Sequence, residues 1–122
     1  MRYTDFLRIY EGAKTYTDFD MYVAERGWQD WMNSLSDEKI IKYLTTIYSL
    51  AKGDNRERRE TLCSSRSKMS QLFHIPVRTL EAWETSNESG AREMRSYLEA
   101  FYAFAIFTEM IEERENDSTE QD

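Results

Sequence analysis

The sequence is poor in the residues from which disulfide scaffolds, metal centres and histidine-dependent enzymes are built. Its 122 residues include one cysteine and one histidine. Cys63 cannot form a disulfide within the chain, so we expect a buried small apolar side chain, rather than a reactive thiol, in a reducing compartment such as the cytoplasm. His74 alone cannot form a His-based metal cluster or a Ser-His-Asp site. We therefore expect no enzyme, no bound metal and no cofactor.

Proline, glycine and long apolar runs are also scarce. One proline and four glycines, with many Leu, Met, Glu, Arg and Tyr residues, favour a mostly helical chain. No stretch reaches the length of an uncharged membrane span, and the N-terminus lacks the pattern of a signal peptide, so we expect no membrane association. The hydrophobic content of 40% is ample for one core. These features predict an all-α fold: one compact multi-helix domain over residues 1–115.

Capping residues and glycines mark where the helices are expected to begin and end. Helices are predicted over residues 3–14, 19–26, 37–52 and 91–115, and residues 54–62 are expected to form a short charged helix or an ordered connector. Asp18 and Ser36 precede two of them as N-caps, whereas Gly27 and Gly53 follow two of them as stops. From Glu109 onward, seven acidic residues and one basic residue give a charge of −6 over fourteen positions. Residues 116–122 are therefore expected to form a short acidic, disordered tail.

Two tryptophans, Trp28 and Trp31, follow Gly27 closely. Spaced three apart, they would share one face of a helix, and we interpret them as core residues. The alternative is an aromatic surface that contacts a ligand or a protein.

The stretch from Ser65 to Glu84 has the pattern of two short helices joined by a tight corner. Apolar residues fall on one face of each helix, Ile75 fills the corner, and Pro76 suits the first position of the second helix. The inward-facing residues are Met69, Leu72 and Phe73 in the first helix and Leu80 and Trp83 in the second. This layout predicts a helix-turn-helix over residues 65–84, whose second helix can lie in the DNA major groove.

The run Ile75-Pro76-Val77-Arg78-Thr79-Leu80-Glu81-Ala82-Trp83 resembles the helix-turn-helix of the phage repressor and Cro (xenobiotic-response-element) class, particularly small variants from phages and mobile elements. The resemblance covers about a sixth of the chain strongly. It departs from the family at three positions: Arg66 replaces a glutamine, Ser70 a small alanine and His74 the usual turn glycine. The following segment, residues 84–90, is expected to be a loop by composition, and it holds acidic residues where the family often has basic ones.

Net charge is −7, but its distribution is uneven. From Lys52 to Thr79 there are seven basic and three acidic residues, a local charge of +4 that leaves −11 elsewhere. If the segment binds DNA, Arg78 is the candidate for a bidentate guanine contact, and Val77 and Thr79 for contacts to base edges or a thymine methyl. Glu81 would either accept a hydrogen bond from cytosine or repel phosphate. Phosphate contacts are expected from Arg56, Arg59, Arg66, Ser67 and Lys68.

Two functions remain open at this stage. The first is a helix-turn-helix transcriptional regulator that binds double-stranded DNA. It would act as a repressor of its own operon or of a neighbouring one. It would form a homodimer through the long C-terminal helix, because the apolar face of this helix is wider than one packing contact needs. The second is an acidic protein inhibitor, encoded by a phage or mobile element, that uses the same scaffold to occupy a host nucleic-acid-handling effector, as anti-CRISPR proteins do with CRISPR effectors. Charge outside the motif favours the second, and the motif favours the first.

Overall fold

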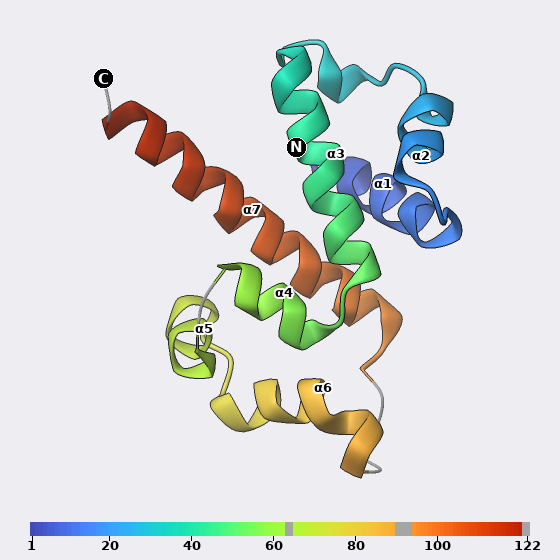
Figure 1. Cartoon of the computed structure of the whole chain (residues 1–122). Helices are drawn as coiled ribbons and strands as arrows, with labels where there is room; N and C mark the ends of the chain where they lie inside the picture. Colours follow the sequence, from blue (N-terminus) through green and yellow to red (C-terminus); the bar gives the residue numbers. More distant parts are fainter. Residues whose placement is uncertain (63–64, 90–93, 121–122) are drawn as a thin grey trace. The chain divides into compact units, whose positions relative to one another are not determined.

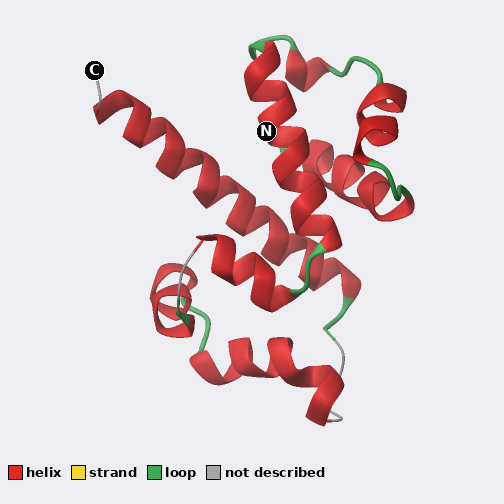
Figure 2. Cartoon of the chain, in the orientation of Figure 1, coloured by secondary structure: helices red, strands yellow, loops and turns green. Residues whose placement is uncertain are grey.

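The computed structural model describes residues 1–62, 65–89 and 94–120, and this part of the chain contains helices and turns without a strand (Figure 1 and Figure 2). The expected all-α class is confirmed. The chain divides into two compact units, Met1–Lys52 (unit 1) and Gly53–Asp122 (unit 2), where the sequence analysis expected one domain over residues 1–115. The division falls at Gly53, the predicted helix stop, directly after the last residue of the helix that ends at Lys52.

Unit 1 consists of three α-helices and one short 3-10 helix. They are α1 (Tyr3–Thr15), α2 (Phe19–Arg26), η1 (Asp30–Met32) and α3 (Asp37–Lys52). The Asp18 carboxylate accepts the backbone N–H of Asp20 at 2.9 Å, and the Ser36 hydroxyl accepts that of Lys39 at 3.3 Å. Both predicted N-caps are therefore confirmed, because each satisfies an N–H that has no partner within its helix.

The buried side chains of unit 1 come mainly from α1 and α3, which pack against each other (Figure 1). They are Phe6, Ile9, Tyr10, Ala13, Tyr22, Met32, Ile40, Leu44, Ile47 and Leu50. Ile41, predicted to belong to the inward stripe of α3, is exposed instead. One residue is about 100° of helical rotation, so Ile41 lies well round from the face shared by Ile40, Leu44 and Ile47.

Tyr22 makes the unfolding free energy of unit 1 depend on pH in the alkaline range. Its hydroxyl is buried and donates to the backbone carbonyl of Ile9 at 2.9 Å. Burial raises the pKa of Tyr22 from 10.0 to about 12, against the opposing effect of Arg26. Folding thus favours the neutral phenol, a stabilisation that is complete below about pH 10 and lost as the pH rises through about 12. Between these pH values we expect the unfolding free energy of the wild type to fall more steeply than that of Tyr22→Phe. Chemical denaturation at a series of pH values measures this difference, and parallel curves would contradict it.

The interpretation of Trp28 as a core residue is wrong. Gly27 ends α2 with φ 71° and ψ 179°, so the chain leaves the helix in an extended direction and Trp28 does not lie on a helix. The Trp28 side chain is 64% exposed. Trp31, in η1, is half-buried and stacks against Tyr43 of α3 with ring centroids 6.3 Å apart.

The backbone conformation of Gly27 predicts that a substitution there is destabilising, although there is space for a larger side chain. A Cβ at this position would meet no atom within 4 Å, but the φ/ψ pair lies in a region that is essentially restricted to glycine. We expect Gly27→Ala to lower the unfolding free energy of unit 1 by about 1–3 kcal/mol. Gly53→Ala, at a glycine whose φ is not positive, is the matched control. Equal stability of the two variants in urea denaturation would contradict the prediction.

The described residues of unit 2 form four helices. They are α4 (Asn55–Leu62), α5 (Arg66–Phe73), α6 (Val77–Ser89) and α7 (Ser96–Glu120). Within the unit, α4 packs against α6 and α7, and α5 packs against α6 (Figure 1). The predicted short charged helix at 54–62 corresponds to α4.

The boundaries of the last two helices differ from the predictions. The loop expected from Glu84 is wrong, because α6 continues to Ser89. The polar composition of this segment suggested a loop, but its polar side chains are bonded within the folded unit. The Thr85 hydroxyl donates to the backbone carbonyl of Glu81 at 2.8 Å within the helix, and Glu84 forms ion pairs. The last helix was predicted over 91–115, but α7 begins at Ser96, and residues 90–93 lie outside the described part of the chain. The disordered tail from residue 116 is not confirmed, since α7 extends to Glu120.

The apolar surface of α7 is indeed wider than its buried face. Ala100, Tyr102, Ala103, Ile106 and Phe107 are buried. Tyr97 and Phe101, which the sequence analysis included in the apolar stripe, are exposed. Two large aromatic side chains one helical turn apart therefore remain at the surface of unit 2.

Candidate nucleic-acid interface

The corner between α5 and α6 forms as the sequence pattern predicts, except that the second helix begins one residue later than expected, at Val77. The Ser65 hydroxyl accepts the Lys68 N–H at 3.2 Å and caps α5. His74 adopts the left-handed conformation, with φ 57° and ψ 39°, which is uncommon for residues other than glycine. The Pro76 carbonyl accepts the N–H groups of Thr79 and Leu80, so Pro76 caps α6 and the helix begins at Val77.

Buried apolar side chains fix α6 against the rest of unit 2. Met69 of α5 and Leu80 of α6 are fully buried. Trp83 is half-buried, and its ring meets Tyr102 of α7 edge-on with centroids 5.2 Å apart. Leu72, predicted to face inward, is exposed, because the short α5 turns Met69 and Phe73 toward the interior and leaves Leu72 at the edge. The inward face of α6 is thus held in place.

The outward face of α6 carries the predicted base-contacting residues. Val77, Arg78 and Glu81 are exposed, and Thr79 is half-buried. Ser67 and Lys68, in the first turn of α5, are exposed as well. Within the described residues, neither Lys68 nor Arg78 forms an ion pair. These two cations are therefore available to an external anion.

Three other predicted phosphate contacts are engaged inside unit 2. Arg59 forms a bidentate pair with Glu84: Nε lies 2.8 Å from Oε2 and Nη2 lies 3.0 Å from Oε1. The side chains are 8% and 1% exposed respectively. Arg66 lies 3.3 Å from the same Glu84 carboxylate and 3.8 Å from Glu81. Arg56 pairs with Glu60 at 2.9 Å on the surface of α4.

The Arg59–Glu84–Arg66 network joins α4, α5 and α6 through one buried carboxylate. Its main effect on titration is that the hydrogen bonds that Arg59 donates to the Glu84 carboxylate raise the pKa of Arg59, against the opposing effect of burial. Two guanidinium groups directed at one carboxylate favour a structural role for Arg59 and Arg66, since a buried side chain offers little surface to phosphate. Phosphate contact by these two residues stays a prediction.

One buried cation in α4 was missed by the sequence analysis, which counted it only among the basic residues between Lys52 and Thr79. Arg58 is 2% exposed, and its Nη1 lies 2.7 Å from both the side-chain oxygen Oδ1 of Asn55 and a Glu99 carboxylate oxygen. The signal for it was the spacing of Asn55, Arg58, Arg59 and Leu62, which places these residues on one side of a helix.

Other kinds of site find no support in the part of the chain that the structure describes. No group of three His, Cys, Asp or Glu side chains there has the arrangement of a metal site. No helix among the described residues is both long and apolar enough to cross a bilayer. Cys63, predicted to be a buried apolar residue, lies outside that part.

The chain matches no protein-family model, no curated protein and no solved structure. Functional inference therefore depends on the geometry of the two units and on the pattern of residues in α5 and α6.

Proposed function

We propose that the α5–α6 segment binds double-stranded DNA and that the protein acts as a small transcriptional regulator. One observation carries the proposal: the first turn of α6 presents Arg78 to solvent, without an ion pair among the described residues, on a helix fixed by buried Leu80. A guanidinium on the exposed start of a recognition helix is suited to reading guanine O6 and N7 in the major groove.

The neighbouring residues have complementary roles in this proposal. Val77 and Thr79 contact base edges or a thymine methyl group. Ser67 and Lys68 bind phosphate at the start of α5, where the helix dipole also favours an anion. Glu81 accepts from cytosine when it is released from Arg66, its partner at 3.8 Å. Arg56 adds a peripheral phosphate contact.

We also propose that the regulator is a homodimer through α7, since Tyr97 and Phe101 are exposed on this helix. Two copies would place two recognition helices on successive half-sites, and a repressor with this arrangement reads a palindromic operator. The operator upstream of its own gene or of a neighbouring operon is the natural target for repression.

The experiment is a salt series of DNA-binding titrations. Fluorescence anisotropy measures the affinity for a duplex from the region upstream of the gene and for a random duplex of equal length and base composition. We expect tighter binding to the upstream duplex, with log K falling linearly with log salt at a slope of about 0.9 per phosphate contacted. Equal affinity for both duplexes, or no binding at low salt, would refute sequence-specific regulation.

A second candidate function is favoured by the pairing of arginines of unit 2 with carboxylates of the same unit. Arg59 and Arg66 pair with Glu84, which reduces the cationic surface of unit 2, and residues 53–122 carry nine basic and fifteen acidic residues, a net charge of −6. Such a surface suits a protein inhibitor that occupies the nucleic-acid channel of a host effector, such as a CRISPR effector.

The two candidates predict opposite results with a purified CRISPR effector. An inhibitor is expected to slow its target cleavage, and neutralising the acidic pair Glu109→Gln and Glu112→Gln is expected to weaken that inhibition. Unchanged cleavage at excess protein would count against this second candidate for the effector tested, and would leave the DNA-binding proposal unaffected.

A further inference from the structure

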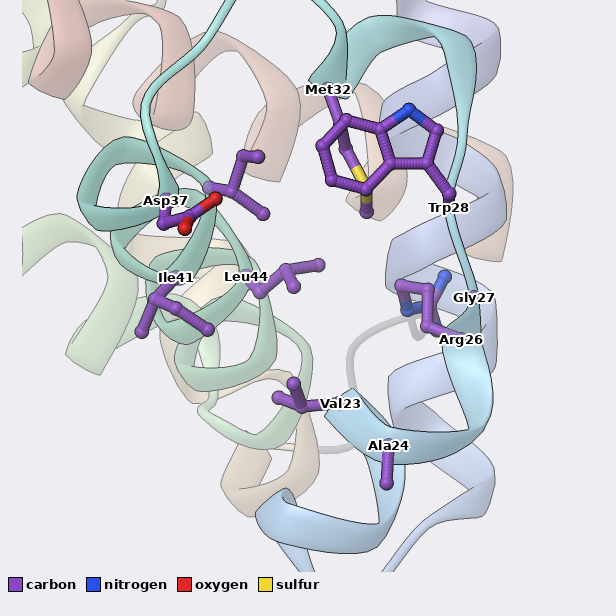
Figure 3. A pocket seen from close by; sticks show the side chains of 10 residues that line it. Val23, Ala24, Arg26, Gly27, Trp28, Met32, Asp37, Ile41 and Leu44 are labelled. Carbon is purple, nitrogen blue, oxygen red and sulfur yellow. The ribbon is translucent and has the colours of Figure 1, made fainter.

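Unit 1 contains an apolar groove that the DNA-binding proposal does not use. It has a volume of about 250 Å³ and lies between α2, the segment after Gly27 and the first half of α3 (Figure 3). Its apolar walls are formed by Val23, Trp28, Met32, Ile40, Ile41 and Leu44. A cavity of about 150 Å³ accepts benzene, so this groove has room for an apolar body of about ten non-hydrogen atoms.

Trp28 forms a fixed wall of the groove rather than a mobile surface side chain. Its indole N–H donates to the Asn33 side-chain oxygen at 2.6 Å. The glycine-restricted backbone at Gly27 leads the chain out of α2, and Trp28 lines the groove together with the buried Met32 (Figure 3). Trp28 and Ile41 are nevertheless among the most exposed large apolar residues of unit 1. A fixed indole beside an open apolar groove is a preorganised contact for a ligand.

Arg26 supplies a cation at one side of the groove. Its guanidinium carbon lies 4.2 Å from the centroid of the Tyr22 ring, and Gly12 of α1 leaves space for it, because a Cβ there would lie 2.9 Å from Nη2. Arg26 has no carboxylate partner among the described residues, and its buried Nε–H has no acceptor. Because no carboxylate neutralises it, the guanidinium gives this side of the groove a positive charge that attracts an anion.

The only other charged side chain lining the groove in the described part of the chain, Asp37, restricts the charge of the ligand. It lies across the groove from Arg26, at the start of α3 (Figure 3). An anionic group is therefore attracted to the Arg26 side and repelled from the Asp37 side. A ligand with one carboxylate at one end fits this distribution better than a dianion or a cation.

We propose that this groove binds a small carboxylate with an aromatic or aliphatic body, with the carboxylate on Arg26 and the body against Trp28, Met32 and Leu44. Unit 1 is then a ligand-binding unit joined to the α5–α6 segment of unit 2. The proposal does not depend on DNA binding, because its evidence lies entirely within unit 1.

The test uses 3-phenylpropionate as the probe and its neutral amide, 3-phenylpropionamide, as the matched control compound. Titration of the full chain is followed by the Trp28 indole signal in ¹H–¹⁵N NMR spectra, which Trp28→Ala identifies, and by calorimetry. We expect the carboxylate to bind at least tenfold more tightly than the amide. Arg26→Gln should remove this preference, whereas Arg8→Gln, at an exposed arginine of α1, should retain it.

Three outcomes would overturn the proposal. The first is no shift of the Trp28 indole at millimolar probe, and the second is equal affinity for carboxylate and amide in the wild type. The third is that the Trp28 signal depends on protein concentration rather than on the probe, which would indicate that a second copy covers the groove. If Arg26→Gln does not fold, Trp28→Ala decides instead: its exposed side chain contributes little to the core, and its replacement should weaken carboxylate binding at least tenfold.

Discussion

Glu84→Ala is expected to lower the unfolding free energy of unit 2 by about 3–5 kcal/mol. The Glu84 carboxylate is 1% exposed and pairs with Arg59 at 2.8 Å and with Arg66 at 3.3 Å. Removing it takes away the bidentate carboxylate of the buried Arg59 cation, and the Glu60 carboxylate lies farther from Arg59, at 4.0 Å. The loss exceeds that for a surface pair because water cannot readily replace the missing carboxylate.

Urea denaturation of the full chain, followed by the fluorescence of Trp83 in a Trp28→Phe, Trp31→Phe background, measures this effect in unit 2. Arg56→Ala is the matched control, because Arg56 pairs with Glu60 at 2.9 Å but both side chains are at least half exposed. The control should cost less than about 1 kcal/mol. Similar losses for the two variants would show that the buried pair is no more important than the surface pair.

Arg78→Ala is expected to weaken binding to the upstream duplex by about 1–3 kcal/mol, which is roughly 5- to 150-fold in Kd. The same variant should change affinity for random duplex much less, because a base contact contributes to sequence preference rather than to phosphate attraction. Anisotropy titrations at fixed salt measure both affinities.

Arg8→Ala controls for the loss of one positive charge, since Arg8 is an exposed arginine on α1 of unit 1. It should leave the preference for the upstream duplex intact. An equal loss for both duplexes in Arg78→Ala would reassign Arg78 to phosphate, and an equal loss in both variants would indicate a net-charge effect without a specific contact.

The sequence predicted the local features of this fold because they depend on neighbouring residues. Asp18, Ser36 and Ser65 cap their helices by hydrogen bonds that span two or three positions. The left-handed conformation at His74 and the start of α6 beside Pro76 also follow from a short pattern. Arg78 and Lys68 are exposed as the helical spacing indicates.

The ion pairs between residues far apart in the sequence were not predictable in the same way. Arg58 and Arg59 are adjacent, but one pairs with Glu99 and the other with Glu84, 41 and 25 positions along the chain. Charge alone made them indistinguishable from exposed Arg56. Trp28 was misplaced because a single glycine backbone angle at Gly27 removed it from the helix on which its spacing with Trp31 was counted.

The most direct test of the central claim, that α6 reads DNA sequence through Arg78, is selection from a random duplex library with wild type and Arg78→Ala in parallel. We expect the wild type to enrich a motif that contains an invariant guanine. The variant should enrich a motif that has lost the guanine preference at that position while the others remain. No enriched motif with the wild type, or the same guanine preference with Arg78→Ala, would contradict the claim.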